Sequence, residues 1–159
     1  ALPGDEVTLA AVDKGASVAE VVEAVQRASG AGMATSVMVL AGLAGRERSL
    51  VHARRTAEAV NRMEPTHTAV LTYTPTPGSP LFDRFERGAL ELPGPLEVLE
   101  EIRELVRHLR CRTHFSCNHA SNHLPLDGRL PSARADLLRS LDAGLAGRVR
   151  LRPEWLRSL

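Results

Sequence analysis

The densest group of side chains able to bind a metal or to react lies in the second half of the chain. Cys111, His114, Cys117, His119 and His123 fall within thirteen residues. Thiolate and imidazole are ligands that Zn²⁺ prefers, so this group raises a zinc hypothesis. Its spacing, Cys-x2-His-x2-Cys-x-His-x3-His, matches no standard zinc module. The alternative is a loop with hydrogen-bonded histidines and small buried cysteines, and we assign no metal ligand.

A glycine-rich turn follows the first apolar run of the chain. In Gly42-Leu-Ala-Gly-Arg-Glu47, glycines allow close backbone approach, and the helix expected next presents free N–H groups. The turn lacks the Lys-Ser/Thr pair of a P-loop and the full dinucleotide fingerprint. A ligand loop and an ordinary strand-to-helix turn therefore both stay open.

Two further patterns bear on catalysis. Gly78-Ser79-Pro80 lacks the elbow pattern of a serine nucleophile, so it carries no hydrolase hypothesis. Glu97, Glu100, Glu101 and Glu104 share a predicted helix with interleaved arginines, which is typical of a solvated charged face. We assign no catalytic residue.

Composition restricts the class of protein. Hydrophobic residues make up 43% and charged residues 25%, as in globular domains. Aromatic residues make up 3%, and 20 basic residues balance 19 acidic ones without a basic block, so we expect neither nucleic acid nor an anionic membrane as partner. The two cysteines, and the lack of a signal-peptide or membrane-spanning pattern, lead us to expect a cytoplasmic protein.

Alternating elements must position these residues. Residues 34–41 and 67–73 are apolar and β-rich, with the length of buried parallel strands. Residues 17–29 and 47–63 have the apolar period of helices. The order helix, strand, helix, strand predicts an α/β fold with parallel pairing.

Local patterns add detail to the helices. Ser17 and Glu20 have the spacing of a capping box. In the helix 47–63, Leu50 and Val51 share the predicted inward stripe with Ala57, Val60 and Met63. Further helices are expected over 5–12, 81–87, 95 to about 109 and 133–146, with a stiff Pro-rich loop at 74–80 and a loop or short strand plus loop at 113–131.

Three motifs occur in a fixed order along the chain. They are Val39-Leu-Ala-Gly-Leu-Ala-Gly-Arg-Glu47, Leu71-Thr-Tyr-Thr-Pro-Thr-Pro-Gly-Ser-Pro-Leu81, and Asn118-His-Ala-Ser-Asn-His-Leu-Pro-Leu126 followed by Gly128-x-Leu-Pro131. With them the chain resembles radical S-adenosylmethionine enzymes, in particular bacterial iron-sulfur oxidoreductases related to oxygen-independent coproporphyrinogen oxidases. The resemblance extends over essentially the whole chain.

The resemblance implies a fold and a site. Residues 34–41 and 67–73 would be the fifth and sixth strands of a partial (β/α)6 TIM-type barrel, with residues 1–90 forming its C-terminal half and residues 91–159 a helical and loop extension packed on it. The loops after these strands would hold the adenosyl part of S-adenosylmethionine. The implied cofactor-binding residues are Gly42, Gly45, Glu47, Tyr73, Pro75 and Pro77, and a loop facing a small-molecule substrate would contain Asn118, His119, Ser121 and Asn122.

The sequence departs from the family in two respects, since it also lacks the first half of the barrel, strands one to four. Such enzymes bind a [4Fe-4S] cluster through Cys-x3-Cys-x2-Cys, which this sequence lacks, and Cys111 and Cys117 are too few and lie elsewhere. We therefore expect S-adenosylmethionine and the cluster in a full-length parent, of which this chain would be a C-terminal fragment or a degenerate relative, inactive by itself.

Two consequences follow from these departures. The alternative to an enzyme fragment is a non-catalytic α/β module for ligand binding or protein interaction, built on the same scaffold. In either case, a missing fourth strand would leave strand 34–41 with an open edge, which predicts self-association.

Overall fold

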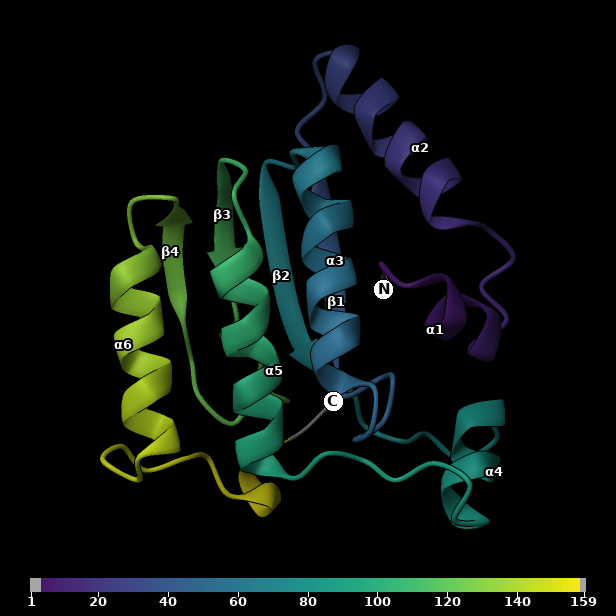
Figure 1. Ribbon diagram of the computed structural model, residues 1–159, viewed down its shortest axis with the longest axis vertical. Coiled ribbons are helices and arrows are strands. Elements are labelled where there is room, and N and C mark those ends of the chain that lie inside the picture. The colour runs from purple at the N-terminus through teal and green to yellow at the C-terminus, as the bar shows by residue number, and fades with distance from the viewer. Residues whose placement is uncertain (1–3, 158–159) are drawn as a thin grey trace.

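Helices and strands alternate along the first half of the chain and meet in one α/β fold (Figure 1). The structure is a computed structural model and describes residues 4–157. The elements are α1 (Glu6–Ala11), α2 (Val18–Gly30), β1 (Ser36–Ala41), α3 (Ser49–Met63), β2 (His67–Thr72), α4 (Pro80–Glu86), α5 (Pro95–His108), β3 (Thr113–Ser116), β4 (Asp127–Leu130), α6 (Arg134–Leu145) and the 3-10 turn η1 (Glu154–Leu156).

The strands form one open sheet in the order β1-β2-β3-β4. β1 and β2 are parallel, with Ser36 opposite His67 and Ala41 opposite Thr72. β3 continues the parallel sheet beside β2, and β4 pairs antiparallel with β3. The predicted α/β class and the parallel pairing of the first two strands are confirmed.

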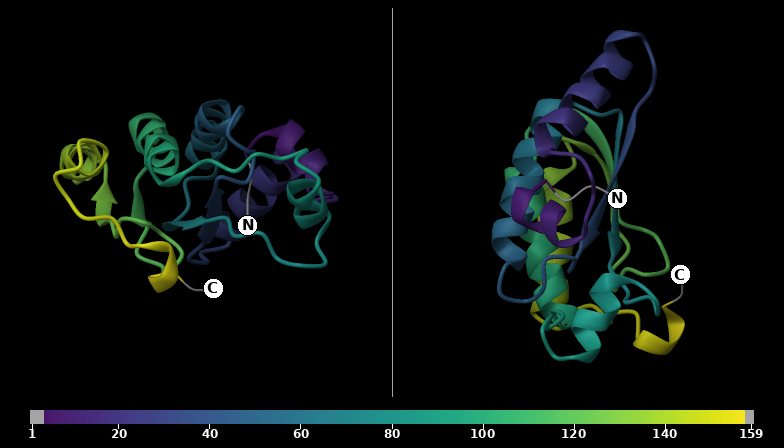
Figure 2. Two further views of the ribbon diagram at one scale, coloured as in Figure 1. Left: turned by 90° about the horizontal axis from the view of Figure 1, so that it is seen from below. Right: turned by 90° about the vertical axis from the view of Figure 1, so that its right-hand side faces the viewer.

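One face of the sheet is covered by a row of helices. α3, α5 and α6 stand side by side over it (Figure 1), and the view along the strands separates the helical layer from the sheet (Figure 2, left). The alternation of β1 follows from this arrangement, because Val37 and Val39 point into the core while Met38 on the other face is 46% exposed. The core lies between this row and the sheet.

The second half of the chain adds two strands to the sheet, where a helical and loop extension was expected. Residues 113–131, for which a loop or a short strand plus loop was predicted, contain β3 and β4. β3 is only four residues long, and its inward positions are Thr113 and Phe115. A run of four residues is too short to show a clear apolar period. Its strand conformation depends on pairing with β2.

The predicted inward stripe of α3 is partly wrong. Leu50 and Val51 are 43% and 39% exposed. The buried face instead includes Ser49, His52 and Thr56. These polar side chains turn inward because their hydrogen-bonding partners lie on α5 and in the N-terminal segment, which offsets the cost of burying them.

Helix α2 begins as predicted. The Ser17 hydroxyl accepts the Glu20 N–H at 3.2 Å, and the Glu20 carboxylate accepts the Ser17 N–H at 2.7 Å. The capping box is therefore confirmed. Among the helices within residues 4–157, none combines the length and the apolar character that crossing a bilayer requires.

Candidate functional site

A cavity of about 480 Å³ lies where β1 and β2 end. Ligands of parallel α/β folds gather at the C-terminal ends of the strands. Gly42 lies at this end of β1, and Tyr73 and Pro75 lie at this end of β2. The described residues that line the cavity are Gly42, Thr72, Tyr73, Thr74, Pro75, Leu92, Pro93, Gly94, Pro95, Val98, His123 and Arg157.

Three of the residues implied by the resemblance lie outside this cavity. Gly45 and Glu47 line a separate hollow of about 280 Å³ against the segment that follows α4. Pro77 is exposed and lines neither hollow. The structure thus brings Gly42, Tyr73 and Pro75 together and places the other three apart from them.

The lining suits binding of a partly planar, partly polar ligand. Tyr73, Pro75 and Val98 line the same cavity, and Thr74 adds a polar residue to it. The hydroxyl of Thr72, a further lining residue, donates to Asn122. Burial raises the pKa of the Tyr73 hydroxyl, which the Ser79 side chain partly offsets, so this phenol is neutral near pH 7. No carboxylate or thiol is among the described lining residues. The lining residues can therefore contact a ligand through apolar groups and hydrogen bonds.

The glycines of the turn after β1 are required by close packing as well as by backbone angle. Gly42 and Gly45 have φ values of +84° and +75°, where a side chain is strained. A Cβ at Gly45 would lie 2.8 Å from the Leu90 side chain, and one at Gly42 would lie 3.3 Å from Pro93. The segment before α5 therefore packs directly against this turn, which we call the glycine loop, residues 42–48.

Charged side chains join the glycine loop to the same segment at the surface. The Arg46 N–H donates to the Glu91 carbonyl at 2.8 Å, and its guanidinium pairs with the Glu91 and Glu97 carboxylates. The Gly94 N–H, which bonds to Glu97, lowers the pKa of that carboxyl. These groups are largely exposed, so each pair contributes little to stability.

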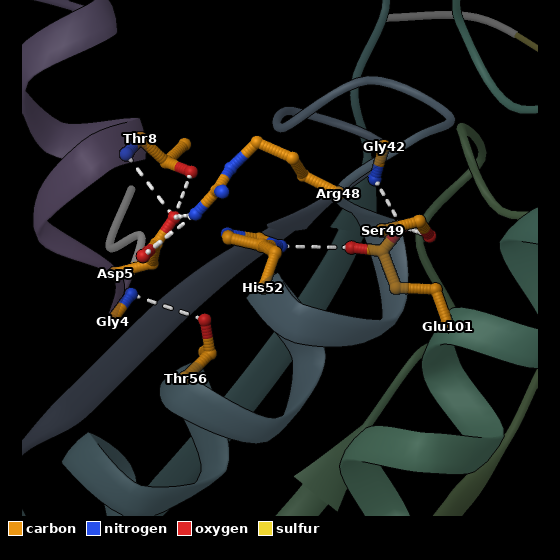
Figure 3. Close-up of polar contacts among 9 residues, drawn as sticks. All are labelled: Gly4, Asp5, Thr8, Gly42, Arg48, Ser49, His52, Thr56 and Glu101. Atoms are coloured by element: carbon orange, nitrogen blue, oxygen red, sulfur yellow. Dashed lines mark hydrogen bonds and ion pairs between the residues drawn. The ribbon is translucent and has the colours of Figure 1, made fainter.

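A buried carboxylate lies beneath the glycine loop (Figure 3). Glu101 of α5 is 3% exposed and accepts three hydrogen bonds, from the Gly42 N–H at 3.0 Å, the Ser49 hydroxyl at 2.5 Å and His52 Nδ1 at 2.9 Å. The prediction of a solvated face is therefore wrong for Glu101. Its hydrogen bonds offset the cost of burying the carboxylate. Glu100 beside it is exposed as predicted.

Sequence reasoning missed this network, although a signal was present. Glu101 lies three residues after Val98 and four before Leu105, on the apolar stripe of α5 that faces the core. His52 likewise lies on the inward face of α3 and is fully buried. An isolated polar residue in an apolar stripe indicates a buried partner, and here the two share one hydrogen bond.

The N-terminal segment is clasped to α3 beside this network (Figure 3). The Gly4 N–H donates to Thr56 Oγ1 at 3.1 Å, and a Cβ at Gly4 would lie 2.4 Å from Thr56 Cα. Asp5 caps α1 through Thr8 and pairs with Arg48 at 3.0 Å. Burial opposes ionisation of Asp5, but its bonds with Thr8 and Arg48 outweigh this and lower its pKa.

The loop 118–126 completes the hydrogen bonding of β2 beyond the end of β3. The Asn122 amide donates to the Val70 carbonyl at 2.8 Å and accepts the Thr72 hydroxyl at 3.0 Å. The Thr72 N–H donates to Ser121 Oγ at 3.2 Å. Two residues implied to face substrate, Ser121 and Asn122, are thus buried at 2% and 0% and bind the strand.

The other two residues implied to face substrate lie nearer the surface. Asn118 and His119 are exposed, and His119 Nδ1 interacts with Ser121 Oγ at 3.0 Å. The C-terminal segment holds this loop, because the Arg152 guanidinium donates to three of its carbonyl oxygens, those of His119, Ala120 and Asn122.

The cysteines and histidines of the zinc hypothesis are not brought together. Cys111 precedes β3 and Cys117 follows it, and both are buried. Burial raises the pKa of the Cys117 thiol to about 12. His114 faces the other side of the strand and pairs with Asp127 at 3.0 Å. Within residues 4–157, no three such side chains are grouped so as to hold a metal ion.

Comparisons of the chain with protein-family models, with curated proteins and with solved structures found no match.

Proposed function

We propose that the chain binds the adenosyl part of S-adenosylmethionine, as the C-terminal portion of a radical S-adenosylmethionine iron-sulfur oxidoreductase that acts on a small-molecule substrate. The observation that carries the proposal is the cavity at the ends of β1 and β2, where Gly42, Tyr73 and Pro75 meet. These residues belong to two of the motifs on which the resemblance rests. β1 and β2 would then be the fifth and sixth strands of a partial (β/α)6 barrel.

The residues present fit the adenosyl group. A cavity of about 480 Å³ is within the usual range of small-molecule sites, about 300 to 1,000 Å³. Gly42 allows close approach at its wall, and Tyr73 and Pro75 offer flat surfaces for a base. S-adenosylmethionine supplies the adenosyl group and a sulfonium centre, and this chain's part is to bind and orient them.

The residues present do not fit the [4Fe-4S] cluster. Binding it takes at least three cysteine thiolates in the family pattern, and this sequence has two cysteines. Both are buried at opposite ends of β3, away from the cavity lining. The cluster would come from a preceding part of a full-length parent. This disagreement favours the second candidate, a non-catalytic binding module on the same scaffold, for the chain by itself.

Calorimetric titration with S-adenosylmethionine and S-adenosylhomocysteine tests the proposal. We expect dissociation constants below about 1 mM, as for a site that retains several of its contacts. Tyr73→Ala is expected to weaken binding about tenfold by removing an aromatic wall. Thr76→Ala, an exposed neighbour outside the lining, serves as the control. Absence of binding by the unaltered chain would refute the proposal.

The enzyme fragment and the binding module differ in what precedes the chain. The fragment predicts an in-frame Cys-x3-Cys-x2-Cys upstream of Ala1 in the gene, roughly 100 to 150 residues away, a distance set by three or four strand-helix units. A reading frame without it favours the module. Either form is proposed to be cytoplasmic, where Cys111 and Cys117 would stay as thiols.

We also propose that copies of the chain associate through β1. This strand forms one edge of the sheet, and within residues 4–157 no strand pairs with its outer side. Light scattering is expected to show dimers or larger species. Met38→Lys, which places a charge on the exposed face of the edge strand, is expected to shift the protein toward monomer. A monomeric state of the unaltered chain would contradict this part of the proposal.

A further inference from the structure

The Glu101 carboxylate joins both ends of the glycine loop. Oε2 accepts the N–H of Gly42, the first residue of the loop, and also the hydroxyl of Ser49, which directly follows it. Oε1 accepts Nδ1 of His52 one turn further along α3. One side chain of α5 thus sets the span of a loop that links β1 to α3 (Figure 3).

The three donors require a group that only accepts. A carboxylate accepts on both oxygens, whereas a glutamine has one acceptor oxygen, so its NH₂ group would face either His52 Nδ1 or the pair of donors on the other side, the Gly42 N–H and the Ser49 hydroxyl. The Glu101 side chain is 3% exposed, so water cannot replace a lost partner. The His52 Nε2 atom has no hydrogen-bond partner among residues 4–157, so the His52 ring makes its hydrogen bond through Nδ1, to Glu101.

The network also determines which part of Gly42 faces the cavity. The Gly42 N–H is used by Glu101, and its carbonyl accepts the Gly45 N–H at 3.1 Å. The peptide planes on both sides of Gly42 are therefore held where Gly42 lines the cavity. Val98, one turn before Glu101 on α5, lines the same cavity. One turn of α5 therefore lines the cavity through Val98 and holds Gly42, another lining residue, through Glu101.

We infer that Glu101 is the positioning residue of the adenosyl cavity, which holds Gly42 in place without touching the ligand. The inference rests on the proposed function, since it assumes that the cavity is the adenosyl site. The shape of the cavity then depends on a buried carboxylate that lies outside the three sequence motifs.

The test compares Glu101→Gln with Glu100→Gln, the matched change at the exposed neighbouring position. S-adenosylhomocysteine affinity is measured by calorimetry, and amide hydrogen exchange is measured at Gly42 and at Val70 in β2. We expect Glu101→Gln to weaken binding about tenfold, the effect of about one hydrogen bond. We expect faster exchange at Gly42 with unchanged exchange at Val70, which a general loss of stability would not produce.

The outcomes separate the inference from the proposed function. If the unaltered chain does not bind, the proposed function fails and this inference fails with it. If the unaltered chain binds and Glu101→Gln binds equally well, only the inference is overturned. If Glu101→Gln does not fold, Ser49→Ala removes one donor and leaves the carboxylate, and about a threefold to tenfold loss of affinity is expected. Unchanged affinity in Ser49→Ala would then overturn the inference.

Discussion

The two walls of the cavity are held by polar clusters of different kinds. The glycine loop depends on one buried carboxylate, Glu101, which takes hydrogen bonds from three donors. The other wall, at the end of β2, depends on neutral groups, the Asn122 amide and the Ser121 hydroxyl. In each cluster, side chains supply hydrogen bonds to backbone groups at or just beyond the end of a strand, the Gly42 N–H after β1 and the Val70 carbonyl and Thr72 N–H of β2.

The two walls therefore differ in how strongly each depends on a single residue. A buried charge is tolerated only with several well-placed donors, and its removal leaves all of them unpaired at once. A neutral amide makes weaker bonds, and its loss leaves fewer groups unpaired. The glycine loop is therefore expected to be the more sensitive wall, and the β2 wall the more tolerant one.

The largest effect is expected from Glu101→Ala. Removing the carboxylate leaves the Gly42 N–H, the Ser49 hydroxyl and His52 without their partner, so we expect a loss of about 3 to 5 kcal/mol in the free energy of unfolding. Urea denaturation measures it. Glu100→Ala, the exposed neighbour, is expected to change stability by no more than about 0.5 kcal/mol. Equal stability of the two variants would show that the glycine loop does not depend on Glu101.

A smaller loss is expected from Asn122→Ala. The Val70 carbonyl and the Thr72 hydroxyl would lose their partner, so about 1 to 3 kcal/mol of stability is expected to disappear. Asn118→Ala changes an exposed residue of the same loop and is the matched control. Thermal unfolding of both variants gives the measurement. A loss larger than that of Glu101→Ala would reverse the order of the two walls.

Asp5 is expected to make stability depend on pH on the glycine-loop side. Its pKa in the folded protein lies below the ordinary value of 3.8, so its contribution is present above that pH and is lost as the pH falls through the folded value. Asp5→Asn is therefore expected to cost about 1 kcal/mol at pH 6 and progressively less below pH 4. Unfolding at a series of pH values tests this. A pH-independent difference would show that the ionised carboxylate, with its bonds to Thr8 and Arg48, is not its source.

The smallest effect is expected from Arg46→Ala. Its pairs with Glu91 and Glu97 are exposed, so the variant is expected to lose no more than about 1 kcal/mol, and less in high salt. Melting temperatures at low and high salt measure both quantities. A loss as large as that of Glu101→Ala would mean that the glycine loop is held from the surface, contrary to the proposed role of the buried carboxylate.

Much of the fold was predictable because its signals are local. The capping box of Ser17 and Glu20 and the apolar runs that became β1 and β2 each depend on neighbouring residues. β3 was harder to recognise, because a four-residue strand has too short a pattern and depends on pairing with β2. Of the six residues implied to bind the cofactor, Gly42, Tyr73 and Pro75 line the cavity, while Gly45, Glu47 and Pro77 do not.

Apolar period, caps and turn residues act over a few positions, so most helices, the parallel pair of β1 and β2 and the glycine turn could be predicted from the sequence. The burial of Glu101, the binding of Ser121 and Asn122 to β2 and the outward position of Leu50 became known only from the folded chain. The physical reason is that a polar side chain is stable inside only when its partners are there, and these partners lie about 50 residues away along the chain.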